Sequence, residues 1–82
     1  MILVDVEVPI LNKVYDFELD ENVFIADLED EIADMISMTE RNIEFDDESQ
    51  MLLYNVSNHQ LLLSTNTLAF YDIKSGSRLL FV

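Results

Sequence analysis

The stretch HQLLLSTNTLAFYDIKSGSRLLFV, residues His59–Val82, decides the fold of this chain. Residues 60–63 have the composition of a short strand, and residues 78–82 form a second apolar run. Between these runs, the apolar spacing of residues 67–73 predicts a helical turn, and Ser75-Gly76 predicts a reverse turn. The stretch contains neither a glycine-rich phosphate loop nor a cysteine, which indicates a compact module that acts through its surface.

An N-terminal β-hairpin is predicted upstream of this stretch. Residues 2–8 alternate between apolar and polar side chains, the period-two pattern of a half-buried strand. Pro9 ends this strand, because proline cannot donate a hydrogen bond to a sheet. The alternation returns over residues 14–19 after a connection of about four residues, a length that is common in hairpins.

An amphipathic helix follows the hairpin, over about residues 24–38, because the apolar spacing changes there to three and four residues. Asp20-Glu21-Asn22 is predicted to cap its first turn, since these side chains accept hydrogen bonds and carry charge that suits the positive end of the helix dipole. The side of the helix opposite the apolar stripe carries a candidate acidic helix face. Its residues are Asp27, Asp30, Glu31 and Asp34.

Two further strands are predicted over residues 51–56 and 59–63, joined by a tight turn at Ser57-Asn58, where asparagine is able to take a positive φ. Residues 39–50 are expected to form a loop or a short strand. The order is then strand, strand, helix, strand, strand, short turn, strand. This order predicts the α+β class and a β-grasp fold, with one main helix across a mixed sheet of four to five strands and adjacent first and last strands. We expect residues 1–82 to form a single domain.

Composition and charge exclude several functions. Seventeen acidic residues against four basic ones give a formal net charge of −13, which disfavours binding to nucleic-acid phosphates. The absence of cysteine fits a reducing compartment. The N-terminus lacks the basic region of a signal peptide, and no stretch approaches the roughly 20 apolar residues of a membrane-spanning helix. We therefore expect a cytoplasmic protein without direct membrane insertion.

The chain resembles ubiquitin-like proteins over its full length. The resemblance rests on Leu62, the Leu68-x-x-Tyr71-x-Ile73 segment, the Ser75-Gly76 turn and Leu79-x-Phe81. It implies that the Tyr71 hydroxyl buttresses a loop, as the corresponding tyrosine does in ubiquitin.

Among ubiquitin-like proteins, the chain is most similar to the EsaB/YukD family, the small standalone component of type VII secretion systems in Gram-positive bacteria. The similarity lies in Gln60-Leu61-Leu62, the following Leu-x-x-Tyr-x-Ile segment and Gly76 before the last strand. It implies a cytoplasmic accessory protein that supports or regulates secretion of small helical WXG100 substrates without catalysis. Ubiquitin-like modifiers and sulfur carriers need a flexible C-terminal diglycine, whereas Phe81-Val82 is expected to lie in a strand. We therefore expect a non-conjugating protein that is not an enzyme.

No catalytic, cofactor-binding or metal site is predicted. His59 is the single histidine of the sequence and is expected to be an exposed turn residue, because no second ligand stands near it in the sequence. Asp46-Asp47-Glu48 lacks the central glycine of a calcium loop and is expected to be a solvated acidic segment. Met35, Met38 and Met51 are expected to fill the core.

The face of the sheet away from the helix is the candidate protein-interaction surface. Only alternate residues of a strand can point at the helix, so consecutive apolar residues must place some side chains on the other face. The candidate residues are Leu53, Leu61, Leu63, Leu80 and Val82, and Tyr54 is the alternative to Leu53 in its strand. An apolar patch of this kind predicts a protein partner, either a secretion component or a second copy in a homodimer.

Two alternatives remain open at this point. A loop around Ile43 and Phe45 could cover part of the apolar patch. The protein could also be an acidic mimic of nucleic acid that inhibits a DNA-binding protein, since its acids are concentrated between Asp16 and Glu48.

Overall fold

The computed structural model describes residues 1–40 and 51–82. The predictions for Ile43, Phe45 and the acidic segment 46–48 lie outside these residues. The described elements follow in chain order: β1 (Ile2–Val8), the 3-10 helix η1 (Pro9–Leu11), β2 (Lys13–Leu19), α1 (Ile25–Thr39), β3 (Leu53–Asn55), β4 (Gln60–Leu62) and β5 (Arg78–Phe81).

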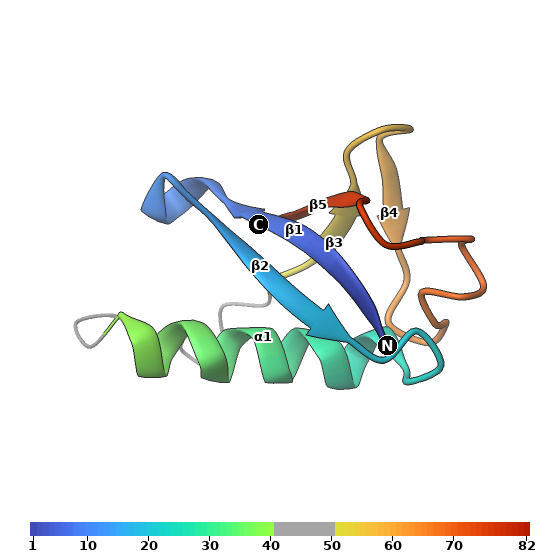
Figure 1. Ribbon diagram of the computed structural model, residues 1–82, viewed down its shortest axis with the longest axis horizontal. Coiled ribbons are helices and arrows are strands. Elements are labelled where there is room, and N and C mark those ends of the chain that lie inside the picture. The colour runs from blue at the N-terminus through green and yellow to red at the C-terminus, as the bar shows by residue number, and fades with distance from the viewer. Residues whose placement is uncertain (41–50) are drawn as a thin grey trace.

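In the described part of the chain, five strands form one mixed sheet in the order β2-β1-β5-β3-β4. Strand β1 pairs antiparallel with β2 and parallel with β5, and β3 pairs antiparallel with both β5 and β4. Figure 1 shows α1 lying along one side of this sheet. The predicted β-grasp order, with adjacent first and last strands, is confirmed.

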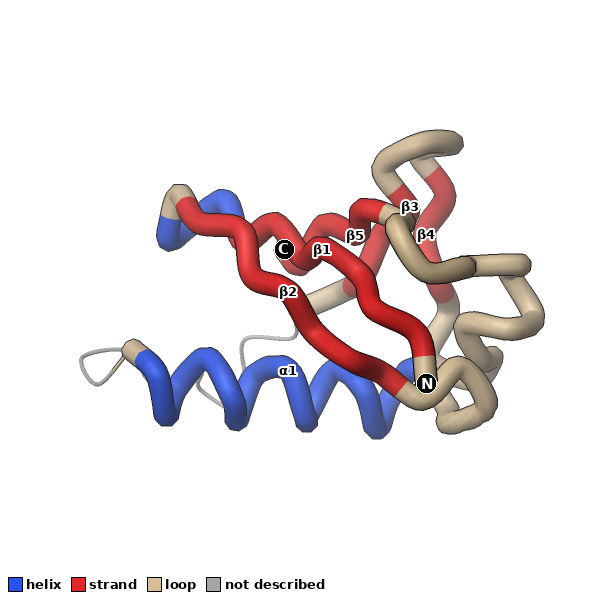
Figure 2. The backbone as a smooth tube through the Cα atoms, in the orientation of Figure 1, coloured by secondary structure: helices blue, strands red, loops and turns tan. Residues whose placement is uncertain are grey.

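The core lies between α1 and the sheet face turned toward it. Strand β1 buries Val4, Val6 and Val8 and leaves the residues between them outside the core, as the period of two requires. Helix α1 contributes a buried stripe at the predicted spacing of three and four residues: Ile25, Leu28, Ile32 and Ile36. Figure 2 shows the strands and α1 as two layers, so the sheet has a face turned away from α1, here called the open face.

The start of α1 differs from the prediction. The side chains of residues 20–22 do not cap the helix, and Phe24 stands at the N-cap position without a side-chain hydrogen bond. Instead, the amides of Ile25 and Ala26 donate to the carbonyl oxygens of Asn66 and Ser64, at 2.8 and 3.1 Å. These are donors that a helix leaves unpaired at its N-terminus, and here a loop distant in sequence satisfies them. The capping prediction was therefore wrong, because a local pattern carries no signal of such a partner.

Two turns also differ in detail. The positive φ between β3 and β4 belongs to His59, at 55°, and not to Asn58, the residue that the sequence suggested for it. The Asn58 side chain instead accepts a hydrogen bond from the amide of Gln60. Residues 68–72 form consecutive hydrogen-bonded turns where a helical turn was predicted.

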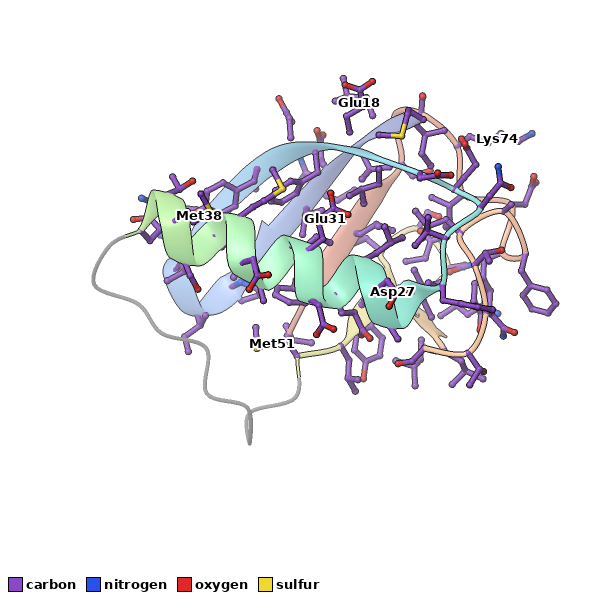
Figure 3. The ribbon with its side chains drawn as sticks, turned by 90° about the horizontal axis from the view of Figure 1, so that it is seen from below. Glu18, Asp27, Glu31, Met38, Met51 and Lys74 are labelled. Carbon is purple, nitrogen blue, oxygen red and sulfur yellow. The ribbon has the colours of Figure 1, made fainter. Side chains whose placement is uncertain are left out.

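The methionines divide between core and surface. Met51 packs against the core as predicted. Met35 and Met38 are exposed, Met38 by 78%, and Figure 3 shows Met38 on α1 in the view toward the helix. The prediction that these two residues fill the core was wrong, because Ile32 and Ile36 already supply the buried positions of those turns.

Candidate protein-interaction surface

The register of the strands brings separate residues into one row across the open face. Glu7 of β1 lies beside Leu80 of β5. Leu80 lies beside Tyr54 of β3, and Tyr54 lies beside Leu61 of β4. At the other end of the row, Val14 of β2 pairs with Glu7. The row therefore contains one residue from each described strand.

Four of the five predicted apolar residues lie on this face. Leu61, Leu63 and Val82 are 36%, 51% and 42% exposed, and Leu80 is half-buried. Each is one residue away along the chain from a core residue (Leu62, Leu79 or Phe81), as alternation requires.

The placement of Leu53 on the open face was wrong. Leu53 is fully buried, because it pairs with Leu62 on one side and Phe81 on the other, and both of these face α1. Its neighbour Tyr54 takes the place on the open face. We call Tyr54, Leu61, Leu63, Leu80 and Val82 the apolar strip.

A groove of about 430 Å³ lies at one side of the apolar strip. Leu80 and Tyr54 form apolar surface in it, and the turn between β3 and β4 forms a wall. That wall is held in shape by the Asn55 side-chain oxygen, which accepts hydrogen bonds from the amide and the hydroxyl of Ser57 at 3.2 and 3.1 Å. The lining residues are Glu7, Tyr54, Asn55, Val56, His59 and Leu80.

Glu7 is the acidic residue that lines this groove, and Asp5 lies on the same face of β1. Arg78 lies 3.9 Å from both Asp5 and Glu7, with all three side chains well exposed. Exposed pairs at such a distance are weak, so Arg78 neutralises the two carboxylates only in part. Asp5 also lies opposite Asp16 of β2, and a hydrogen bond to Asp5 together with the Asp5 charge raises the pKa of Asp16.

The candidate acidic helix face lies on the other side of the molecule. Asp27, Asp30, Glu31 and Asp34 are all exposed, and Figure 3 shows Asp27 and Glu31 on α1 in the view from the helix side. The sheet lies behind the helix in this view, so the acidic helix face and the apolar strip cannot contact one flat partner surface together.

Tyr71 has the role that the resemblance implies. Its hydroxyl accepts hydrogen bonds from the amide of Leu63 at 2.9 Å and from the side chain of Asn66 at 3.0 Å. The carbonyl of Asn66 in turn accepts the first amide of α1. Tyr71 therefore holds the loop that closes the helix start.

Sequence reasoning missed Glu7, Asn55 and Val56 as lining residues of the groove, and it identified His59 only as an exposed turn residue, which the structure confirms. The alternation in β1 placed Glu7 on the face turned away from the core, and this signal could have identified it as a residue of the open face. The predicted order already made β1 and β5 neighbours, but the residue beside Glu7 could not be named without the register of that pair.

Solved structures with the same arrangement are ubiquitin-like domains. The EccD5 ubiquitin-like domain from Mycobacterium xenopi superposes with a TM-score of 0.80 at 16% identity, covering 99% of this chain and 91% of that one. A ubiquitin-like domain of an Arabidopsis thaliana protein gives a TM-score of 0.70 at 23% identity, covering 99% and 74%. The fold is the ubiquitin-like β-grasp. No family model and no curated protein matches the sequence.

A longer protein contains the same fold. A chain of the ESX-5 inner membrane complex superposes with a TM-score of 0.80 at 20% identity, and the match covers 99% of this chain. The present chain spans only 20% of that protein's length. At these identities the likeness concerns the fold alone.

Two further findings concern the described residues. None of their helices combines the length and apolar character needed to cross a bilayer. Residues 1–40 and 51–82 also contain no group of three or more His, Cys, Asp or Glu side chains arranged to hold a metal ion.

Proposed function

We propose that this protein is a non-enzymatic, non-conjugating ubiquitin-like interaction module, and that it is a cytoplasmic accessory component of a type VII secretion system. In this proposal, residues 1–82 act as one domain that binds a protein component of the secretion machinery through the apolar strip. The observation that carries it is the apolar strip itself, because exposed apolar side chains gathered on one face of a small domain mark a protein-binding surface.

Two observations favour type VII secretion among the many systems that use this fold. The fold is shared with a domain of EccD5 and with a chain of the ESX-5 inner membrane complex, and ESX-5 is a type VII system. The C-terminal segment also carries the sequence pattern by which the chain resembles the EsaB/YukD family. The fold alone does not determine function, so the proposal rests on the two observations together.

A bacterial secretion assay tests this proposal. The gene is deleted in its own host, after its neighbourhood has been inspected for an FtsK-like ATPase and WXG100 genes, and secreted WXG100 protein is quantified by immunoblotting. We expect deletion to reduce secretion and the wild-type gene to restore it. Leu80→Ser should fail to restore it, whereas Met38→Ser, a matched change of an exposed apolar residue on α1, should succeed. Unchanged WXG100 secretion in the deletion strain would refute the assignment.

The second candidate function is an acidic mimic of nucleic acid that inhibits a DNA-binding protein. The four exposed carboxylates of the acidic helix face favour it, because a row of charges can attract a basic surface. This candidate requires binding that weakens steeply with salt and that DNA competes away. Substitution of Asp30 and Asp34 by Asn should then abolish binding, while Leu80→Ser should leave it intact.

A further inference from the structure

The groove beside the apolar strip combines apolar walls with acidic groups. Leu80 and the Tyr54 ring supply aliphatic and aromatic surface, and Glu7 supplies a carboxylate at the same place. The side chains of lysine and arginine have this combination in complementary form, with an apolar stem and a cationic head. An aromatic face such as that of Tyr54 also attracts a cation directly.

The charges around the groove favour a cation over a neutral or anionic group. Asp5, Glu7 and Asp16 lie on neighbouring strands of the open face, and Arg78 lies 3.9 Å from Asp5 and from Glu7. One guanidinium shared at that distance between two exposed carboxylates leaves negative charge uncompensated. Asp5 pairs with Asp16 in the register of β1 and β2, so these two carboxylates also lie side by side on this face.

The same charges oppose a second copy of the chain as the occupant. A two-fold symmetric contact through the open face would bring Asp5, Glu7 and Asp16 of one copy toward the same residues of the other. Each copy carries a formal net charge of −13, and like charges across an interface suppress association. A basic partner would not be repelled in this way, and its positive charges would be attracted to the acidic side chains of the open face.

We propose that the groove lined by Glu7, Tyr54 and Leu80 receives a lysine or arginine side chain from an apolar, basic segment of a partner protein. The neighbouring apolar side chains of that segment lie on the apolar strip. In the free protein, the Arg78 guanidinium lies 3.9 Å from Glu7. It therefore competes with the incoming cation for this carboxylate. This inference rests on the proposed function, because it specifies the chemistry of the partner for the same face.

A defined peptide tests the inference on the full chain. Three short peptides are compared at physiological ionic strength: one alternates lysine with leucine, one glutamate with leucine, and one lysine with serine. Kd is measured by fluorescence anisotropy, and the contact site by amide chemical shifts. We expect the lysine–leucine peptide to bind at least about tenfold more tightly than the other two, the order of one charge-assisted hydrogen bond. Its shifts should centre on Glu7, Tyr54 and Leu80.

Variants separate the groove from a general attraction to an acidic protein. Glu7→Gln should raise the Kd for the lysine–leucine peptide about three- to tenfold, and Leu80→Ser should raise it by a similar factor. Asp72→Asn is the matched control: it makes the same charge change as Glu7→Gln at an exposed turn residue, and asparagine tolerates its φ of 57°. The Kd of the lysine–leucine peptide for the Asp72→Asn variant should change less than twofold. Arg78→Gln should tighten binding, since the internal competitor is lost, and a gain of affinity cannot result from misfolding.

Several results would overturn the inference. Asp72→Asn could weaken binding as much as Glu7→Gln, which would indicate diffuse attraction. The glutamate–leucine peptide could bind as well as the lysine–leucine peptide, which would leave only hydrophobic contact. Shifts centred on α1 would move the site to the acidic helix face, and concentration-dependent dimerisation through the open face, seen by sedimentation, would make a second copy the occupant. The binding measurements and the secretion assay use different readouts, so failure of this inference can be distinguished from failure of the proposed function.

Discussion

The Tyr71 hydroxyl joins the 63–66 loop to the segment that leads into β5. It accepts two hydrogen bonds, from Leu63 and Asn66, and Tyr71→Phe would leave both donors without this acceptor. We expect a loss of about 1 kcal/mol in the free energy of unfolding, which lowers Tm by roughly 4–8 °C in a domain of this size. Urea unfolding of the wild type and the variant, monitored by circular dichroism, measures this difference in the free energy of unfolding.

Tyr54→Phe is the control for this experiment. Within the described residues, the Tyr54 hydroxyl has no hydrogen-bond partner, so removing it should change stability by less than about 0.5 kcal/mol. Equal losses in the two variants would show that the Tyr71 hydrogen bonds contribute no stability of their own.

The Asp5–Asp16 pair gives a pH-dependent prediction at the same scale. The pKa of Asp16 is raised because Asp5 on β1 hydrogen-bonds to it and repels its charge, while Arg78 of β5 faces Asp5. A raised carboxyl pKa means that ionisation destabilises the fold, so this destabilisation is present at neutral pH and disappears as pH falls through the raised value. Asp16→Asn should therefore raise Tm at pH 7 and lose this advantage below about pH 4, the ordinary range for Asp.

Glu18→Gln is the matched comparison for Asp16→Asn. It removes one negative charge from the same strand and the same face, but Glu18 pairs with the apolar Leu3. Its Tm gain at pH 7 should be smaller. If the two variants have equal Tm gains at every pH, the repulsion belongs to the whole protein and not to the pair.

At the scale of elements, α1 supplies the whole helical side of the described core, and Ile32 lies at its centre with no exposed surface. Ile32→Ala should cost about 2–5 kcal/mol, the range for such truncations in a core. Small domains have only a few kcal/mol of stability, so we expect this variant to be largely unfolded at 25 °C, with low helical circular dichroism. Asp34→Ala, an exposed change two residues along the helix, should fold normally; a folded, cooperative Ile32→Ala protein would contradict the expectation.

Elements with a strong period were predictable from the sequence, and connections made by distant segments were not. The alternation of β1 and β2 and the spacing of α1 fixed their type and their buried residues, because those patterns reflect burial directly. The start of α1 depends on the carbonyls of Ser64 and Asn66, and the sequence around residues 20–26 does not predict these distant partners. The same holds for the candidate site: alternation identified most of the apolar strip, but Leu53 was misplaced and Glu7 was missed, because both depend on register between strands that are distant in sequence.

At the scale of the whole molecule, the dominant property is the formal net charge of −13 on 82 residues. The described ion pairs are few and exposed, so they offset little of the repulsion between acids. Repulsion within a compact chain destabilises it relative to the expanded unfolded state. Salt screens such repulsion, with a Debye length of about 10 Å at 0.1 M.

We therefore expect NaCl to stabilise the protein, with the urea midpoint rising most steeply between low ionic strength and about 0.2 M, where screening changes fastest. The double variant Asp30→Asn, Asp34→Asn removes two carboxylates that stand four residues apart on α1, a spacing at which like charges repel. It should be more stable than the wild type at low salt and should respond less to added NaCl. Sodium sulfate at matched ionic strength separates screening from preferential exclusion, which stabilises proteins whatever their charge. A midpoint that rises with sulfate but not with NaCl would show that acidic repulsion does not limit the stability of this fold.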